Sequence, residues 1–286
     1  MCLLSSFQIW ILIRLPCQTI DLVGRSRVCA VVSDSTGNTR LHRQLLVNEI
    51  PTIFNLPDIV HFISNTIKDI VKIEYFKVTI SIMRGVITKF HKSHLGTAEL
   101  SFAHIECHIT KGLDAIGKTR FGTIILAAWA LQYNLPAIKR VVDRGNFDLR
   151  VGFIDSGKFF HSAYIKFLKD FAKYFRLTSR ATNDFEFDLS LLIKLGAPAL
   201  KALTCLEANE ATVGDVYVFW HAMIWATKEV LDDPLLEFPV SVKEQVLGIL
   251  NSRHNQIFGD GNLSTSKDLY LSGAYLNPSV SQNVLQ

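Results

Sequence analysis

The sequence predicts an α/β protein that is mostly helical, in which a small α/β core is interrupted by a large all-α insertion. One short, β-rich apolar run at residues 28–33 precedes a helical pattern, whereas almost every segment from Thr97 onward has apolar residues at helical spacing. The alternating residues 269–275 predict a strand that returns to the core. We therefore predict a partial core at 1–94, an all-helical insertion at 95–258, and a returning strand at 259–286.

The predicted core begins with a helix over residues 8–24, which Pro16 interrupts. The buried strand at 28–33 is followed by a helix at 38–50, and then by a loop or short extended piece at 51–57. Residues 58–94 have apolar side chains at helical spacing and predict one long helix or two stacked helices.

The predicted insertion consists of amphipathic or apolar helices. Residues 119–142 predict a helical hairpin that turns at Pro136. Further helices are expected at residues 158–177, 214–233 and 241–258.

The composition argues against a disordered chain, a disulfide-framed protein and a secreted or membrane-spanning protein. Of 286 residues, 49% are hydrophobic and 20% are charged, so the chain can bury a core and is not globally disordered. The five cysteines are scattered and form no CxxC pair, which favours free thiols in a reducing compartment. The apolar N-terminus is preceded by no Lys or Arg and is interrupted by Arg14, so we expect neither a secretory signal nor a membrane span.

Charge is distributed unevenly along the chain. Residues 1–180 contain 24 Lys and Arg against 13 Asp and Glu, a net charge of +11, whereas residues 181–286 have a net charge of −7. A basic surface of this kind suits a polyanion such as nucleic acid. Solvated helix faces explain the same excess, so charge alone leaves both interpretations open.

Two side chains near the predicted strand are candidates for chemistry. Asp34 ends the apolar run, and open α/β sheets place ligand-binding groups at the carboxyl ends of their strands. An Asp in "SDSTGN" is equally typical of a helix cap. His61, at the start of the next helical pattern, either orients a neighbouring group or packs as an ordinary core or cap residue.

Two further groups of residues carry weaker signals. The segments "HKSH" and "HIECH" have histidines and a cysteine at helical spacing, as in a zinc pair, although solvated helix faces explain them equally well. Lys118 and Arg120 in "GKTRFG" precede an apolar helix and could hold a phosphate, but the segment lacks a complete P-loop. The histidines and the cysteine are His91, His94, His104, Cys107 and His108.

Four segments, in this order, resemble the hAT superfamily of DNA transposases, in particular its fungal ribonuclease H-like relatives. They are "AVVSDSTGNTR", "LPDIVHFISNTIKDI", "GLDAIGKTRFGTIILAA" and "EATVGDVYVFWHAM", and the likeness covers roughly residues 22–280. The resemblance implies a ribonuclease H-like fold with an all-helical insertion. It also implies a triad of two Asp and one Glu that binds two Mg²⁺ or Mn²⁺ ions, double-stranded DNA as partner, self-association and a nuclear location.

The resemblance assigns roles to a few residues of this chain. Asp34 matches the second acid of the triad and would be a metal ligand. His61 matches the His of a Cys-x-x-His element and would be a supporting residue, although Asp58 occupies the Cys position. Arg120 and Phe121 correspond to an Arg-Trp doublet that holds DNA, with Lys118 beside them.

The rest of the triad has no match. Only Asp21 precedes Asp34, the last Glu is Glu244, and no acid follows Asp268. We therefore expect a fragmentary or degenerate transposase that binds no metal stably and is catalytically inactive. The alternative is a non-enzymatic helical protein that binds nucleic acid or another protein.

Overall fold

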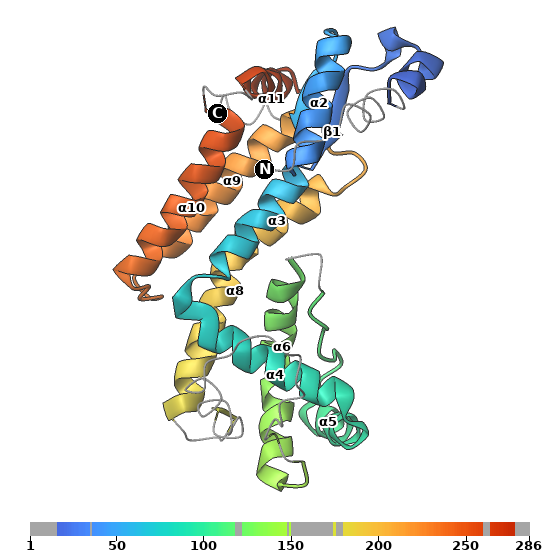
Figure 1. Cartoon of the computed structure of the whole chain (residues 1–286). Helices are drawn as coiled ribbons and strands as arrows, with labels where there is room; N and C mark the ends of the chain where they lie inside the picture. The colour runs from blue at the N-terminus through green and yellow to red at the C-terminus, as the bar shows by residue number, and fades with distance from the viewer. Residues whose placement is uncertain are drawn as a thin grey trace. The chain divides into compact units, whose positions relative to one another are not determined.

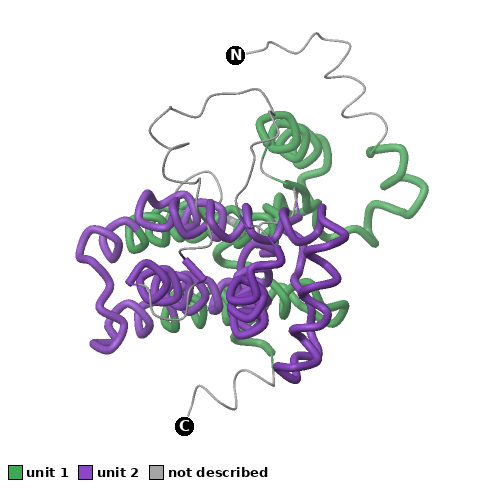
Figure 2. The backbone as a smooth tube through the Cα atoms, turned by 90° about the horizontal axis from the view of Figure 1, so that it is seen from below, with its two compact units in different colours: residues 1–66, 201–226, 246–286 green, residues 67–200, 227–245 purple. Residues whose placement is uncertain are grey.

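A computed structural model describes residues 16–34, 36–117, 122–147, 149, 174–175, 180–259 and 264–277. The chain is mostly helical, as predicted, and contains a small parallel sheet. It divides into two compact units (Figure 2). Unit 1 comprises residues 1–66, 201–226 and 246–286, and unit 2 comprises residues 67–200 and 227–245.

The sheet lies in unit 1 and is a strand–helix–strand element. Strand β1 (Ala30–Ser33) pairs in parallel with β2 (Phe54–Pro57), and helix α2 (Gly37–Glu49) connects them (Figure 1). The predicted strand at 28–33 forms at Ala30–Ser33, but its predicted burial is wrong, because Val32 is 58% exposed and Cys29 is exposed. The predicted helix at 38–50 is confirmed, and the piece at 51–57 contains β2. Buried Leu46, Ile50 and Ile53 pack with Ile20, a residue of the helical segment 16–23, and hold α2 against the sheet.

Helices make up most of the remaining described chain. Residues 58–94 form two helices rather than one, because the 3₁₀ turn η2 (Glu74–Phe76) separates α3 from α4. The predicted helices at 214–233 and 241–258 correspond to α9 and α10, whereas the helix expected at 158–177 lies almost entirely outside the described residues. The bounds are α3 Ile59–Ile70, α4 Lys77–Lys92, α5 His94–Cys107, α6 Gly122–Arg144, α8 Arg180–Leu206, α9 Val213–Asp232, α10 Val240–Phe258 and α11 Ser264–Leu276, with the 3₁₀ turn η1 at Arg25–Arg27.

The predicted turn at Pro136 is wrong, because α6 runs through this residue without a break. Proline removes one backbone hydrogen bond and crowds the preceding turn of a helix, at a cost of ~3 kcal/mol. Apolar side chains on both sides of Pro136 are nevertheless fully buried, among them Leu131 and Ile138. Their burial holds the helix together across the proline.

The predicted returning strand at 269–275 is also wrong, because these residues lie in helix α11. The buried residues of this helix are Ser266, Tyr270 and Ala274, which are spaced four residues apart. Leu271, which the alternating pattern placed in the core, is exposed. Period-2 alternation over so few residues was therefore a coincidence, and the helical period is the one that buries side chains.

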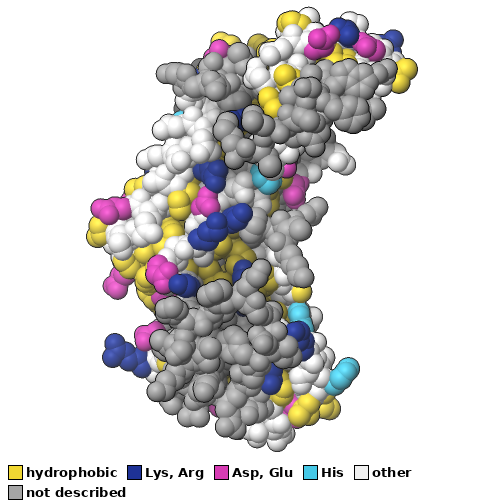
Figure 3. Space-filling view, viewed as in Figure 1, with side chains coloured by type: hydrophobic (Ala, Val, Ile, Leu, Met, Phe, Trp, Pro, Cys, Tyr) yellow, Lys and Arg dark blue, Asp and Glu magenta, His cyan; other side chains and the backbone are white. Residues whose placement is uncertain are grey.

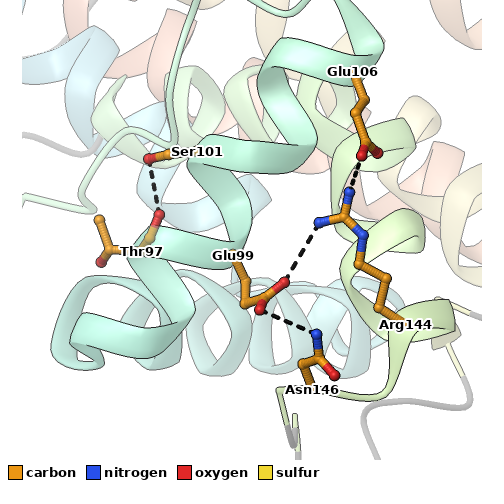
Figure 4. Close-up of polar contacts among 6 residues, drawn as sticks. All are labelled: Thr97, Glu99, Ser101, Glu106, Arg144 and Asn146. Carbon is orange, nitrogen blue, oxygen red and sulfur yellow. Dashed lines mark hydrogen bonds and ion pairs between the residues drawn. The ribbon is translucent and has the colours of Figure 1, made fainter.

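An ion-pair cluster joins α5 to the end of α6 (Figure 4). The Arg144 guanidinium contacts the carboxylates of Glu99, at 3.4 Å, and Glu106. The Asn146 amide donates a hydrogen bond of 3.3 Å to the other Glu99 oxygen. The cluster fixes the position where α6 ends against α5.

Helix α8 is long and apolar enough to cross a membrane by length and composition, and among the described helices it alone passes this test. Its leucines Leu189, Leu192 and Leu195 are fully buried within unit 2. A core helix has the same composition, so the length and hydropathy of α8 do not by themselves indicate a membrane.

Helices α9 and α11 approach each other closely at a pair of glycines in unit 1. A Cβ atom added to Gly214 would lie 2.5 Å from the carbonyl oxygen of Gly273, and one added to Gly273 would lie 3.0 Å from the amide nitrogen of Gly214. These are backbone atoms, which cannot swing aside as a long side chain can. The two helices therefore depend on the absence of side chains at this crossing.

Substitution of Gly214 by Ala should lower the free energy of unfolding by about 1–3 kcal/mol, because α11 must move away from α9. The matched control is Gly248→Ala in α10, where an added Cβ meets nothing within 4 Å. This control should stabilise the protein by up to about 1 kcal/mol through helix propensity. Urea unfolding followed by circular dichroism measures both, and equal effects of the two substitutions would contradict the close crossing.

Candidate functional site

The candidate site lies at the carboxyl ends of the two parallel strands. Asp34 follows β1 directly and Asp58 follows β2. The register pairs Ser33 with Pro57, so both acids leave the same edge of the sheet. Open α/β proteins bind ligands at this edge, which is where the sequence placed Asp34.

Asp34 is not the N-cap of α2, because that position belongs to Thr36. Its carboxylate nevertheless accepts local hydrogen bonds. The Thr39 hydroxyl lies 2.5 Å from Oδ1 and the Thr36 hydroxyl lies 3.3 Å from it. The Thr39 hydroxyl, the backbone and side chain of Thr36, and the nearby His61 together lower the pKa of Asp34 below its ordinary value. Asp34 therefore shapes the loop between β1 and α2 and is held in its ionised form.

Arg43 is the buried centre of the site. Its side chain is 1% exposed, although it is charged and lies in α2. The Nη1 atom donates to the carbonyl oxygens of Ser33 and Asp34, at 2.7 and 2.6 Å, and to the Ser33 hydroxyl at 2.5 Å. Nε donates to Asn55 of β2 at 2.8 Å. One guanidinium thus ties α2, the end of β1 and the middle of β2 together.

The charge of Arg43 is balanced by its surroundings. Burial lowers the pKa of the guanidinium, and the nearby Asp34 carboxylate opposes that shift. The Asp58 carboxylate also favours the charged form, and the Tyr270 side chain of α11 lies nearby. Burial in turn raises the pKa of Tyr270, which is 2% exposed. Because an arginine stays protonated in proteins, the site contains a permanent buried cation.

Asp58 and His61 occupy the start of α3. The Asp58 carboxylate accepts a hydrogen bond of 3.2 Å from the backbone amide of His61, as a helix N-cap does. The backbone amide of Asp58 donates to the Ser33 carbonyl at 2.9 Å, so this carbonyl is shared with Arg43. His61 lies in the first turn of α3 and near Asp34, and its supporting role stays a prediction.

The described residues do not fit a two-metal centre. No group of three or more His, Cys, Asp or Glu side chains that could hold a metal ion occurs in the described part of the chain. One carboxylate oxygen of Asp34, Oδ1, already accepts hydrogen bonds from hydroxyl groups. The backbone carbonyl of Asp34 accepts a hydrogen bond from the Arg43 guanidinium. Each Mg²⁺ ion needs several oxygen ligands, and a two-metal centre needs carboxylates that bind both ions. The described residues around Asp34 do not supply such a set.

The other predicted site residues fall into two groups. Lys118, Arg120 and Phe121, predicted to contact DNA, lie outside the described residues. Among the histidines considered as zinc ligands, His104 Nε2 lies 2.5 Å from the Asn134 side chain, and His91 Nε2 lies 3.1 Å from the Leu113 carbonyl. These polar contacts between elements give both rings a structural role.

Sequence reasoning missed Arg43, although a signal was present. Arg43 and Leu46 lie on the buried face of α2, and Ile50, the C-cap of this helix, continues the same three- and four-residue spacing. A cation on the apolar face of a predicted helix indicates a buried polar network. Asn55 and Tyr270 offered no comparable signal, because each depends on contacts between segments distant in sequence. Comparison with protein-family models, curated proteins and solved structures finds no match for this chain.

Replacement of Arg43 by Met should lower the free energy of unfolding by about 3 kcal/mol. Methionine has a similar length, but it removes the donor to the Asn55 side-chain oxygen and one of the donors to each of the Ser33 and Asp34 carbonyls. The control is Arg40→Met, an exposed position of the same helix, with an expected effect within about 0.5 kcal/mol. Urea unfolding compares the two variants, and similar losses would rule out the special role of Arg43.

Substitution of Asp34 by Asn should change the pH dependence of stability. Because the folded protein lowers the pKa of Asp34, the ionised carboxylate stabilises the fold above its ordinary pKa of about 4. This contribution is lost as the pH falls through the folded value. The difference in melting temperature between wild type and Asp34→Asn should therefore be larger at pH 6 than at pH 3.

A second variant identifies the cause of this effect. Thr39→Val removes the hydroxyl that lies closest to the carboxylate. It should bring the pKa of Asp34 nearer to its ordinary value and so reduce the same pH-dependent difference. A difference that does not vary with pH in the wild-type background would show that these hydroxyls do not stabilise the charge.

Proposed function

We propose that the chain is a degenerate or fragmentary hAT-like transposase that binds double-stranded DNA and does not cut it. The observation that carries the proposal is the parallel β1–α2–β2 element with Asp34 at the carboxyl end of β1. This is the arrangement that the resemblance to a ribonuclease H-like core implies for the second acid of the triad. The helical segments after β2 agree with the implied insertion.

The surroundings of Asp34 support the proposal that cutting has been lost. Strand cleavage by two metal ions needs carboxylates that share the metals and face the substrate. Here the Asp34 carboxylate accepts hydrogen bonds from the hydroxyls of Thr36 and Thr39. The buried cation Arg43 donates to the backbone carbonyl of Asp34. These contacts suit an acid that stabilises a loop and balances an arginine.

The charge of the chain supports DNA as the partner, whereas the nucleus as the compartment follows only from the resemblance. Residues 1–180 have a net charge of +11. On the face shown in Figure 3, however, basic, acidic and apolar side chains are interspersed. Net charge therefore favours a polyanion without locating its binding surface.

We expect the purified chain to bind a 30-base-pair duplex with an affinity that falls steeply with salt. Phosphate contacts release counterions, so the logarithm of the binding constant should fall linearly with the logarithm of the salt concentration. Fluorescence anisotropy from 50 to 300 mM KCl measures this slope. A flat salt response, or no binding at 50 mM, would overturn DNA binding. Incubation of supercoiled plasmid with Mg²⁺ or Mn²⁺ should give no nicks, and nicking that Asp34→Ala abolishes would overturn the inactive assignment.

A second candidate function is protein binding or self-association. Helices α5 and α6 expose large apolar side chains, with Phe102, Ile105 and Trp129 each more than half exposed. Exposed apolar groups on neighbouring helices are typical of protein interfaces. Absence of DNA binding at low salt would favour this alternative.

A further inference from the structure

Unit 2 contains a groove that the proposed function does not yet explain. Its walls come from the end of α3, from η2, from one face of α4, and from the segment 115–117 with the start of α6. The groove has a volume of ≈ 990 Å³, and the isoleucines Ile80, Ile87 and Ile124 form its buried apolar floor. All of its lining residues belong to unit 2, so its shape is set within one compact body.

The rim of this groove is strongly basic. Five cationic side chains and one histidine line it, whereas Glu74 is the only carboxylate among the described lining residues. Glu74 pairs with Lys77 at 3.1 Å, so the single acid is already engaged by one of the cations. The basic lining residues are Lys68, Lys72, Lys77, Arg84, His91 and Lys92.

The basic residues of α4 form a line rather than a compact cluster. Lys77, Arg84 and His91 recur every seven residues, which places them on one face of the helix. From Lys77 to Arg84 and on to His91 the helix rises ~1.5 Å per residue, or roughly 21 Å in all. One DNA strand carries a charge about every 3.4 Å along the helix axis, so this line spans about six phosphates. An extended polyanion matches it better than a small anion does.

We propose that the α4 groove contacts the phosphodiester backbone of a nucleic acid. The described lining offers Lys, Arg, Ser and Thr, which bind phosphate oxygens, and it contains no Phe, Tyr, Trp, Asn or Gln side chain. The inference rests on the proposed function for its partner and adds the surface and the mode of contact. It places binding on helix α4 of unit 2, whereas the residues around Asp34 belong to unit 1.

The test uses paired charge-removing substitutions in the full chain. Arg84→Gln with Lys92→Gln changes two exposed positions of the groove, and Lys201→Gln with Lys228→Gln changes two exposed lysines elsewhere. Both double variants remove the same charge. Circular dichroism and melting temperature should match the wild type in both cases, because each position is exposed.

The probes are a 20-base-pair duplex and a 20-nucleotide single strand, measured by anisotropy across a salt series. The groove variant should reduce the slope of the log–log salt plot by about 2 for duplex DNA and weaken binding at 50 mM salt on the order of tenfold. The control variant should change neither quantity. This outcome would support the groove as the backbone contact.

The remaining outcomes separate the two proposals. If the wild type binds duplex DNA and the two double variants weaken binding equally, the groove assignment is wrong and the proposed function stands. If the wild type binds only the single strand and the groove variant weakens that binding, the groove assignment stands and duplex binding is wrong. If the wild type binds neither probe, both proposals are overturned.

Discussion

The strand–helix–strand element of unit 1 depends on one buried guanidinium. Arg43 is almost inaccessible to solvent, and its donors contact the carbonyls at the end of β1 and the side chain of Asn55 in β2. A sheet of two four-residue strands is marginal in water without further packing. The guanidinium supplies the polar part of that packing, because it adds a donor to the carbonyl oxygens at the end of the short ladder. The charge then requires acids nearby, and Asp34 and Asp58 meet that requirement.

This dependence changes the meaning of the acid at the strand end. An Asp at the carboxyl end of a buried strand suggests chemistry when it is considered alone. In this protein the Arg43 guanidinium donates to the backbone carbonyl of Asp34, and two threonine hydroxyls donate to its carboxylate. The carboxylate therefore balances a buried charge and fixes the loop that leads to α2. A group that stabilises a cation inside the fold is less available to an external cation. The local structure therefore gives Asp34 a role that persists without any metal.

Patterns local in sequence predicted much of the fold, and contacts between distant segments decided the rest. The strand in the apolar run at 28–33 and the helix after it were predicted, because the pattern of apolar and polar residues that marks each element lies within a few neighbouring residues. Pro136 and residues 269–275 were misread, because tertiary burial overrode the proline and the short alternation. Asp34 lies directly after the predicted strand and His61 lies in the first turn of the predicted helix, as their local patterns indicated. The roles proposed for these two residues stay predictions. Arg43 remained unrecognised, since its partner Asn55 is set by strand register.

The two candidate functional features belong to different units of the chain. The acids and the buried arginine belong to residues of unit 1, whereas the basic groove is formed entirely by residues of unit 2. Carboxylates at a strand end repel phosphates unless metal ions intervene, so a nucleic acid gains little from them when no metal is held. The Lys and Arg side chains that line the groove on α4 need no metal to attract a phosphate backbone. Under the proposed function, loss of the triad acids would leave binding through unit 2 intact. Selection that preserves the basic groove of unit 2 need not preserve the acids of unit 1.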